Sequence, residues 1–435
     1  PPLQHDPSSK TFSTVEASTK SLHAPASAKI AMYRERFSVL HQRVIRHSLF
    51  APPVAGAAAS SESLKLTPVA SIRSSSGSIF VLGMLTQPEE DMLCIEDLRD
   101  RVVLDTSEVV TAPGMYTETC IVLAQGKYRA SDDKFVVDLL GFPPPENRVQ
   151  SLLSMGRVDP LGVLHTPAEY TKVAKLQAEA TDATFVIASD LHLDIPGVMD
   201  NLERMFRGFS EAGLVPDMFV LIGNFTSRPF GLGRCGLLVA DRDAYQGNLQ
   251  ALADLISKFP DIKTGSQFVF VPGPNDPGAS SVLPRPPLPA SFTKSLAQLG
   301  RVTFTSNPCR IRFYTQEIVV FRGDSLSRMR RHALLPPSAA SDEPAHAQLV
   351  QTVLDQAHLC PLPPTLQPVY WDYDHALRLY PMPDVLILAD DCDEYHWAYE
   401  GCSVFNPGSF PRETGFIVYR PATRDTEVSR ISDLA

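Results

Sequence analysis

The sequence predicts a small β barrel followed by an α/β domain with buried strands and outer helices. Residues 65–146 alternate short apolar strands with turn residues, as a barrel does. From residue 184 onward, continuous apolar runs alternate with helical stretches, which indicates strands buried on both faces. The 435 residues exceed what one compact core holds and suit two domains with linkers.

Residues 1–64 are expected to form a flexible arm, an amphipathic helix and a linker. The first 28 residues are rich in Ser, Ala, Pro and Lys, a composition typical of an arm or extended strap. One face of the helix is apolar, and the other is basic and expected to be solvated, with contact to nucleic acid as the alternative. The apolar residues are Ile30, Tyr33, Phe37, Leu40 and Val44, and the basic ones are Lys29, Arg34, Arg36, Arg43 and Arg46. Residues 51–63 are a low-complexity linker.

The barrel is of the oligonucleotide-binding (OB) type by strand number and spacing. Its expected strands are 78–84, 102–104, 119–123 and 135–140. Residues 64–148 hold 8 Lys and Arg against 13 Asp and Glu, and the whole chain carries a net charge of −10. A groove for nucleic acid should be basic, so docking of protein is favoured over a single-stranded DNA-binding module, which is kept as an alternative.

Residues 150–435 are predicted to form the α/β domain. Its expected strands are 185–188, 218–222, 268–271, 318–321 and 384–388, and its expected helices include 200–212 and 243–259. A capping box, Thr166-Pro-Ala-Glu169, starts a further helix. The chain has no leader pattern at Pro1–Asp6, no apolar run near the ~18 residues that span a membrane, and 7 scattered cysteines that suit buried thiols.

Polar side chains follow several of the predicted buried strands. They come from the segments Ser189-Asp190-Leu191-His192, Gly223-Asn224-Phe225-Thr226-Ser227, Pro274-Asn275-Asp276 and Asp390-Asp391-Cys392. Sites in open α/β sheets form at the carboxyl ends of strands, so these residues are candidates for a metal or catalytic centre.

In their order and strand context, these segments resemble the motifs of calcineurin-like metallophosphoesterases. The resemblance implies a calcineurin-like α/β sandwich in which most ligands are replaced. Asp190, His192 and Asp276 match the family pattern, and His358 is the candidate for its lone histidine. Asn224, Ser227, Pro274, Asn275, Asp390 and Cys392 stand where the family has other metal-binding or catalytic groups.

The chemistry of these residues argues against a two-metal centre. Paired divalent cations about 3.5–4 Å apart need anionic ligands between them, and the Asn224 amide has no charge. Pro274 offers no side-chain ligand, and Asn275 is not an imidazole that could protonate a leaving group. We therefore expect no cofactor, no catalytic metal and no enzymatic activity. A residual single-metal site at Asp190 and His192 and an active phosphoesterase or nuclease are the alternatives.

Longer segments resemble the B subunits of eukaryotic DNA polymerase epsilon. They are FVIASDLHLD (185–194), LIGNFTSRPF (221–230), FVPGPNDPG (270–278), SNPCRIRFYTQEIVVFRGD (306–324), HLCPLP (358–363), PVYWDYDHALRLYPMPDVLILAD (368–390) and NPGSFPR (406–412). The resemblance implies a nuclear scaffold subunit that binds the zinc-bearing C-terminal domain of the catalytic subunit, the other polymerase subunits and the replicative helicase. The family's additional N-terminal helical domain is not expected here.

Two surface features complete the expectations. The aromatic run with Tyr370, Trp371 and Tyr373 is a candidate partner interface, with core packing as the alternative. The cluster Arg328-Met329-Arg330-Arg331 is interpreted as a solvated helix end.

Overall fold

The computed structural model describes residues 3–6, 9–14, 20–51, 63–156, 159, 166–231, 239–278, 281–336 and 343–434. Almost all of the linker expected over residues 51–63 lies outside these ranges. None of the described helices combines the length and the apolar content that crossing a lipid bilayer would require. The chain divides into two compact units: Pro1–His165 with Ser325–Met382, and Thr166–Asp324 with Pro383–Ala435.

The predicted barrel is present in the first unit. Its sheet has the order β5-β4-β3-β7-β8-β6, and an additional β5–β8 pairing closes it. The elements are η1 (Val69–Ser74), β3 (Ile79–Glu89), β4 (Met92–Glu96), β5 (Arg101–Asp105), β6 (Val110–Thr111), β7 (Ile121–Arg129) and β8 (Lys134–Gly141). Side chains alternate along the strands, so Val102, Leu104 and Phe135 point into one apolar core.

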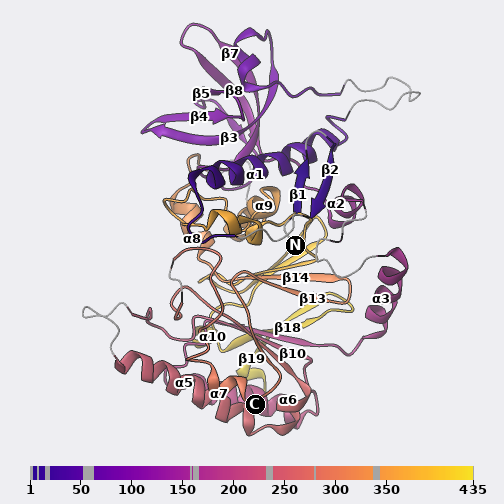
Figure 1. Ribbon diagram of the computed structural model, residues 1–435, viewed down its shortest axis with the longest axis vertical. Helices are drawn as coiled ribbons and strands as arrows, with labels where there is room; N and C mark the ends of the chain where they lie inside the picture. The colour runs from indigo at the N-terminus through magenta and orange to yellow at the C-terminus, as the bar shows by residue number, and fades with distance from the viewer. Residues whose placement is uncertain are drawn as a thin grey trace. The chain divides into compact units, whose positions relative to one another are not determined.

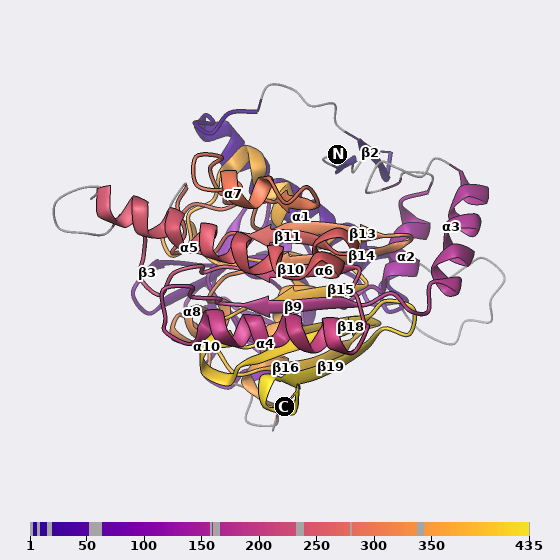
Figure 2. The same cartoon turned by 90° about the horizontal axis from the view of Figure 1, so that it is seen from below.

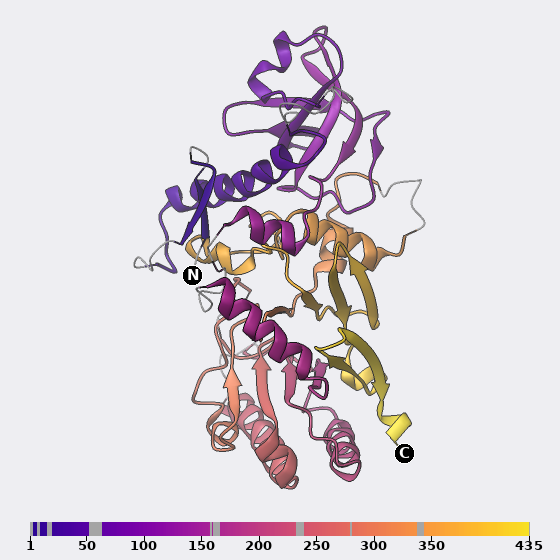
Figure 3. The same cartoon turned by 90° about the vertical axis from the view of Figure 1, so that its right-hand side faces the viewer.

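Helix α1 (Ala26–Arg46) lies beside the barrel strand β3 and the hairpin of β1 (Leu3–Asp6) and β2 (Thr11–Thr14) (Figures 1 and 3). The strap expected over residues 1–28 therefore includes an antiparallel hairpin. Phe12 of the hairpin is buried and stacks on Tyr380, with 5.4 Å between ring centroids.

The prediction that the basic face of α1 is solvated holds for Lys29, Arg34 and Arg46, which are exposed, and is wrong for Arg36 and Arg43. Arg43 is buried and donates hydrogen bonds to the carbonyl oxygens of Pro143 and Asp355. Arg36 pairs with Asp374, and Arg46 pairs with Glu146. The helix packs on more than one side, and each of these guanidinium groups meets a carboxylate or carbonyl that accepts its hydrogen bonds.

Residues 325–382 were expected within the α/β domain, and in the structure they belong to the compact unit that contains the barrel. This segment forms α8 (Ser325–Arg331), α9 (Ala345–Asp355) and η2 (Trp371–Leu377), and the preceding chain adds α2 (Arg148–Ser154). The Gln356 side chain bonds both the backbone N–H and the carbonyl of Ile121 at 2.7 Å. Thr352 accepts from the N–H of Met115 at 2.9 Å. Side chains of the segment 325–382 thus form hydrogen bonds with barrel backbone groups that are far away in the sequence.

The second unit is an α/β sandwich with two sheets. The first has the order β12-β11-β10-β9-β18-β19 and the second β13-β14-β15-β17-β16. The strands of the first are β9 (Phe185–Ser189), β10 (Met218–Ile222), β11 (Gln267–Val271), β12 (Val302–Phe304), β18 (Gly415–Arg420) and β19 (Asp425–Arg430). Those of the second are β13 (Cys309–Phe313), β14 (Gln316–Phe321), β15 (Val385–Leu388), β16 (Tyr395–Tyr399) and β17 (Cys402–Asn406). A core with side chains from both sheets, including Ile187 and Val320, joins them.

Helices cover the outer face of the first sheet (Figure 2). The helices of this unit are α3 (Pro167–Glu179), α4 (Val198–Glu211), α5 (Val239–Ser257), α6 (Pro260–Gly265), α7 (Lys294–Ala297) and α10 (Phe410–Glu413), with η3 (Ile431–Leu434) at the end. The predicted capping box at Thr166 and Glu169 is formed and begins α3. The fold class expected from the sequence, a barrel followed by an α/β sandwich, is confirmed.

Candidate functional site

The polar strand ends of the second unit meet at one edge of its first sheet. Strands β9, β10 and β11 are parallel neighbours, so their carboxyl ends lie together. Asp190 follows β9, Asn224 follows β10, and Asn275 and Asp276 follow β11. The structure therefore brings these predicted residues together at the carboxyl ends of three neighbouring strands, where sites in α/β sheets form.

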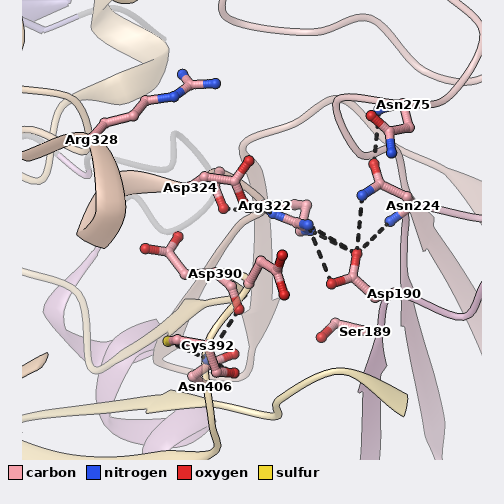
Figure 4. A network of polar contacts seen from close by, with 12 residues as sticks. Ser189, Asp190, Asn224, Asn275, Arg322, Asp324, Arg328, Asp390, Cys392 and Asn406 are labelled. Atoms are coloured by element: carbon pink, nitrogen blue, oxygen red, sulfur yellow. Dashed lines mark hydrogen bonds and ion pairs between the residues drawn. The ribbon is translucent and has the colours of Figure 1, made fainter. Parts of the chain in front are cut away.

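Asp190 is the central acceptor of this site (Figure 4). Its Oδ1 accepts from the backbone N–H of Asn224 at 3.0 Å and from the Asn224 Nδ2 at 3.1 Å. The residue is 2% exposed and has a φ of 53°, a left-handed conformation that Asp tolerates better than most residues. These hydrogen bonds hold the turn that follows β9.

Asn224 and Asp276 are also satisfied within the protein. The Asn224 Oδ1 accepts from the N–H of Asn275 at 2.8 Å. Asp276 accepts from the N–H groups of Gly273 at 2.7 Å and Phe225 at 2.8 Å, and from the hydroxyl of Tyr245 at 3.1 Å. Burial raises the pKa of Asp276 to about 6, although these hydrogen bonds act in the opposite direction.

Two glycines allow the turns of this site to approach one another. A Cβ on Gly223 would lie 2.0 Å from Oδ2 of Asp276, and one on Gly273 would lie 2.4 Å from Oδ1 of Asn224. Both separations are far below van der Waals contact, so a larger residue would displace the hydrogen-bonded side chains.

The remaining predicted residues of the first sheet contribute less. His192 places its Nε2 3.8 Å from Oδ1 of Asp190, and burial lowers the pKa of the imidazole. Ser227 binds Asp194 through its N–H at 2.8 Å and its hydroxyl at 2.5 Å. Pro274 lies in the turn after β11 and has no side-chain ligand atom.

Asp390 and Cys392 lie at the carboxyl end of β15, in the second sheet. Asn406 organises this turn, because its Nδ2 donates to the Asp390 carbonyl at 3.1 Å and contacts the Cys392 Sγ at 3.1 Å. Burial, assisted by the Asp390 charge, raises the pKa of the Cys392 thiol to about 11. The thiol is therefore neutral near pH 7 and is a poor metal ligand in that form.

Arg322 is the residue that the sequence analysis missed. It directly follows β14, whose neighbour β15 is parallel, and so it reaches the same edge as Asp390. Its Nε lies 3.1 Å from Oδ1 of Asp190, and its Nη2 lies 2.9 Å from Oδ1 and 3.2 Å from Oδ2. The sequence did contain a signal for this residue. Arg322 is a basic residue at the end of the buried strand β14, and the other site residues also lie just after the ends of buried strands.

His358 and the aromatic run belong to the first unit. The N–H of Cys360 donates to Nδ1 of His358 at 3.0 Å, so Nε2 carries the proton that faces Asp374 at 3.2 Å. Burial first, and then Arg36, lower the pKa of His358 to about 4. This histidine is therefore neutral and engaged in its own buried network.

The candidate interface residues Tyr370, Trp371 and Tyr373 are half-buried at the start of η2. Lys20 lies over Tyr373, with Nζ 5.8 Å from the ring centroid, and the N–H of Ser21 donates to Asp372 at 3.0 Å.

The predicted basic cluster lies in α8. Arg331 is exposed, whereas Arg328 donates to Gln367 and is therefore engaged within the first unit. The interpretation of this cluster as a solvated helix end thus holds for Arg330 and Arg331, which are both exposed, and is wrong for Arg328.

The residues at the strand ends do not fit the pair of divalent cations that the phosphoesterase resemblance implies. Both oxygens of Asp190 accept from Arg322, and the oxygens of Asn224 and Asp276 face N–H or O–H donors. Across the described residues, no group of three or more His, Cys, Asp or Glu side chains is arranged to hold a metal ion. The hydrogen bonds of this arrangement join strand ends to one another.

Two family models match this chain, one over each of its predicted domains. A family model described as the B subunits of DNA polymerases alpha and epsilon matches residues 185–396, and one described as the OB-fold domain of DNA polymerase epsilon subunit 2-like proteins matches residues 26–144. An archaeal phosphodiesterase of solved structure is similar over 57% of this chain and 98% of its own, with 10% identity and a TM-score of 0.30. The two family models define the class as B subunits of DNA polymerases.

Relatives identify the particular family. DNA polymerase epsilon subunit 2 of Homo sapiens is 42% identical over 93% of this chain and 76% of its own length. DNA polymerase epsilon subunit 2 of Mus musculus is 40% identical over 94% of this chain and 77% of its own length. The chain belongs to the family of DNA polymerase epsilon B subunits, also called subunit 2, which are accessory subunits of a replicative DNA polymerase.

Proposed function

We propose that this chain is a non-catalytic scaffold of the DNA polymerase epsilon complex in the nucleus. In this role it binds the zinc-bearing C-terminal domain of the catalytic subunit and helps link the polymerase to the replicative helicase. The observation that carries the proposal is that the side-chain acceptors of Asp190, Asn224 and Asp276 at the strand-end site bond other groups of the protein. These side chains hold the fold together, and their acceptors are directed at the protein itself.

The site lacks groups that phosphodiester cleavage requires, which supports the proposal. Metal-dependent hydrolysis needs an activated water and a group that protonates the leaving oxygen. Asn275 has no titratable side chain at the position expected for that acid, and its N–H is bonded to Asn224. Because the ligands and the acid are both replaced, the site is a degenerate phosphoesterase centre.

The surface of the barrel supports contact with protein over direct contact with DNA. One hollow of about 310 Å³ is lined by Phe80, Val110, Thr111, Ala112, Leu123, Gln125, Leu139, Leu140 and Gly141. This lining contains no charged side chain, whereas a path for a phosphate backbone would be basic. Val110 and Leu139 are also exposed, at 57% and 48%. DNA contact by this barrel is therefore weak or indirect.

The aromatic run at η2 is the part of the first unit that we assign to the catalytic subunit. Tyr370, Trp371 and Tyr373 keep part of their rings accessible, and aromatic anchors of this kind dominate protein interfaces. Asp374, in the same element, is held by Arg36 of α1, so the backbone that carries the rings is fixed before a partner arrives.

Binding to the zinc-bearing domain of the catalytic subunit tests the proposal. The full chain should form a stoichiometric complex, and Trp371→Ala should weaken affinity roughly 10- to 30-fold. Trp397→Ala is the matched control, because Trp397 is the other tryptophan and lies on β16 in the second unit. Failure of the wild-type chain to bind would defeat the scaffold function, and equal affinities of the two variants would remove only the η2 surface.

A further inference from the structure

The site contains a cation supplied by the protein itself. The guanidinium of Arg322 uses Nε and Nη2 on Asp190, and its Nη1 donates to the Gly323 carbonyl at 2.6 Å and to Oδ1 of Asp324 at 2.7 Å. The side chains of Arg322 and Asp190 are each 3% exposed. Every nitrogen of the guanidinium therefore has a partner, and almost none of the pair is open to solvent.

Burial makes the charge of Arg322 indispensable to its neighbours. A carboxylate as buried as Asp190 is strongly destabilising unless a positive charge or several donors compensate it. Arg322 supplies both, with a planar fork that matches the two carboxylate oxygens. Asp190 and Asp324 would be left as neighbouring anions if the guanidinium were removed.

The pair also connects the two sheets. Asp190 follows β9 of the first sheet, and Arg322 follows β14 of the second. The backbone of Arg322 is fixed as well, since its N–H donates to Oδ1 of Asn307 at 3.1 Å and its carbonyl accepts from Nδ2 of Asn307 at 2.7 Å. A bond between the two strand ends stabilises the left-handed turn at Asp190.

We propose that Arg322 is a built-in counter-ion that takes the place of a bound cation at this edge. It neutralises Asp190, joins the carboxyl ends of β9 and β14, and closes the site to divalent ions. Arg322 is thus a positioning residue. The proposal stands on the geometry of the second unit and does not depend on which partners the chain binds.

Substitution of Arg322 tests this role through rescue. In the full chain, Arg322→Ala should lower the melting temperature of the second unit by about 5–15 °C, as expected when a buried ion pair is broken. Millimolar Mn²⁺ or methylguanidinium should restore about half of this loss, because either cation can occupy the vacated volume beside Asp190 and Asp324. The same ions should leave the melting temperature of the wild-type chain unchanged.

Two control variants separate this effect from general ion binding. Arg310→Ala breaks the pair of Arg310 with the buried Glu317, away from the strand-end site, and either ion should rescue it less than Arg322→Ala. Arg322→Ala combined with Asp190→Asn should also not be rescued. The proposal is overturned if Mn²⁺ raises the melting temperature of the wild type as much as that of Arg322→Ala, or if neither ion rescues Arg322→Ala beyond Arg310→Ala.

A second route applies if Arg322→Ala does not accumulate as folded protein. Arg322→Lys keeps the charge and loses the fork, and it is then combined with Asp190→Asn in a double-mutant cycle. Shifts in melting temperature that are smaller in the double variant than the sum of the single shifts support the counter-ion role. Additive shifts overturn it.

Discussion

The ion pair between Arg36 and Asp374 offers a test of how α1 is held in the first unit. The Arg36 Nε lies 3.2 Å from Oδ2 of Asp374, and Nη2 donates to Oδ1. The side chains are 10% and 6% exposed. Burial would raise the pKa of Asp374, but the charge of Arg36 and the contact with His358 outweigh it and lower the pKa. The carboxylate is therefore charged throughout the physiological range.

Asp374→Asn should lower the free energy of unfolding of the first unit by about 3–5 kcal/mol. This magnitude is typical when one partner of a buried pair is removed and the other charge remains. Arg73→Ala is the matched control, because Arg73 is 43% exposed and pairs with Asp133, which is 60% exposed. A pair so open to water contributes at most about 1 kcal/mol.

Urea unfolding followed by tryptophan fluorescence measures both values. In a Trp397→Phe background, Trp371 is the remaining tryptophan and lies in η2 together with Asp374. In this background, Asp374→Asn should lower the urea concentration at the midpoint of unfolding without changing the slope of the transition. If Asp374→Asn cost no more than Arg73→Ala, the pair would not fasten α1 to η2, and the reasoning would be refuted.

Three further predictions concern pH, packing and nucleic acid. Burial and Arg36 lower the pKa of His358 from 6.5 to about 4, so its stabilising contribution is complete above 6.5 and is lost as the pH falls through 4. When the pH is lowered from about 7 to about 4.5, the free energy of unfolding of the wild type should fall by about 2–3 kcal/mol more than that of His358→Gln. Equal losses of the two proteins in urea titrations would contradict this. Gly126→Ala should destabilise the barrel by about 1–3 kcal/mol, because its Cβ would lie 2.0 Å from the Val136 carbonyl oxygen. Gly247→Ala in α5, where an added Cβ meets no atom within 4 Å, should stabilise the protein by about 1 kcal/mol. The reverse order of melting temperatures would refute the packing argument. Fluorescence anisotropy at low salt should detect no tight binding of a single-stranded oligonucleotide to the full chain, and submicromolar, salt-sensitive binding would contradict the protein-docking role of the barrel.

Nine expected strands are present because the local signal and the burial agree, whereas β4, β12, β13 and β16 to β19 were not among the predicted strands. The continuous apolar runs of β9, β10 and β11 were sufficient to predict these strands, and the polar residues that follow them lie together at one edge of the sheet. The short edge strand β6, with two residues, gives no periodic pattern and was not predicted.

Tertiary pairing explains what the sequence analysis missed. Arg36 and Arg43 have the spacing of a solvated helix face, and only distant segments such as Asp374 and Asp355 reveal that they are buried. Arg322 sits 132 residues from Asp190 in sequence, and no local rule indicates which carboxylate it meets. The packing of residues 325–382 in the unit of the barrel has the same origin, since Thr352 and Gln356 satisfy barrel backbone groups far away in the chain.

Metal content is the most direct test of the central claim, which is that the strand-end site is neutralised from within. The purified full chain is dialysed to equilibrium against Mn²⁺ and then washed and analysed for bound metal. The account predicts far less than one ion per chain, with no difference between the wild type and Asp190→Ala. One or two stoichiometric ions that disappear in Asp190→Ala would show that the site still binds cations and would contradict the account.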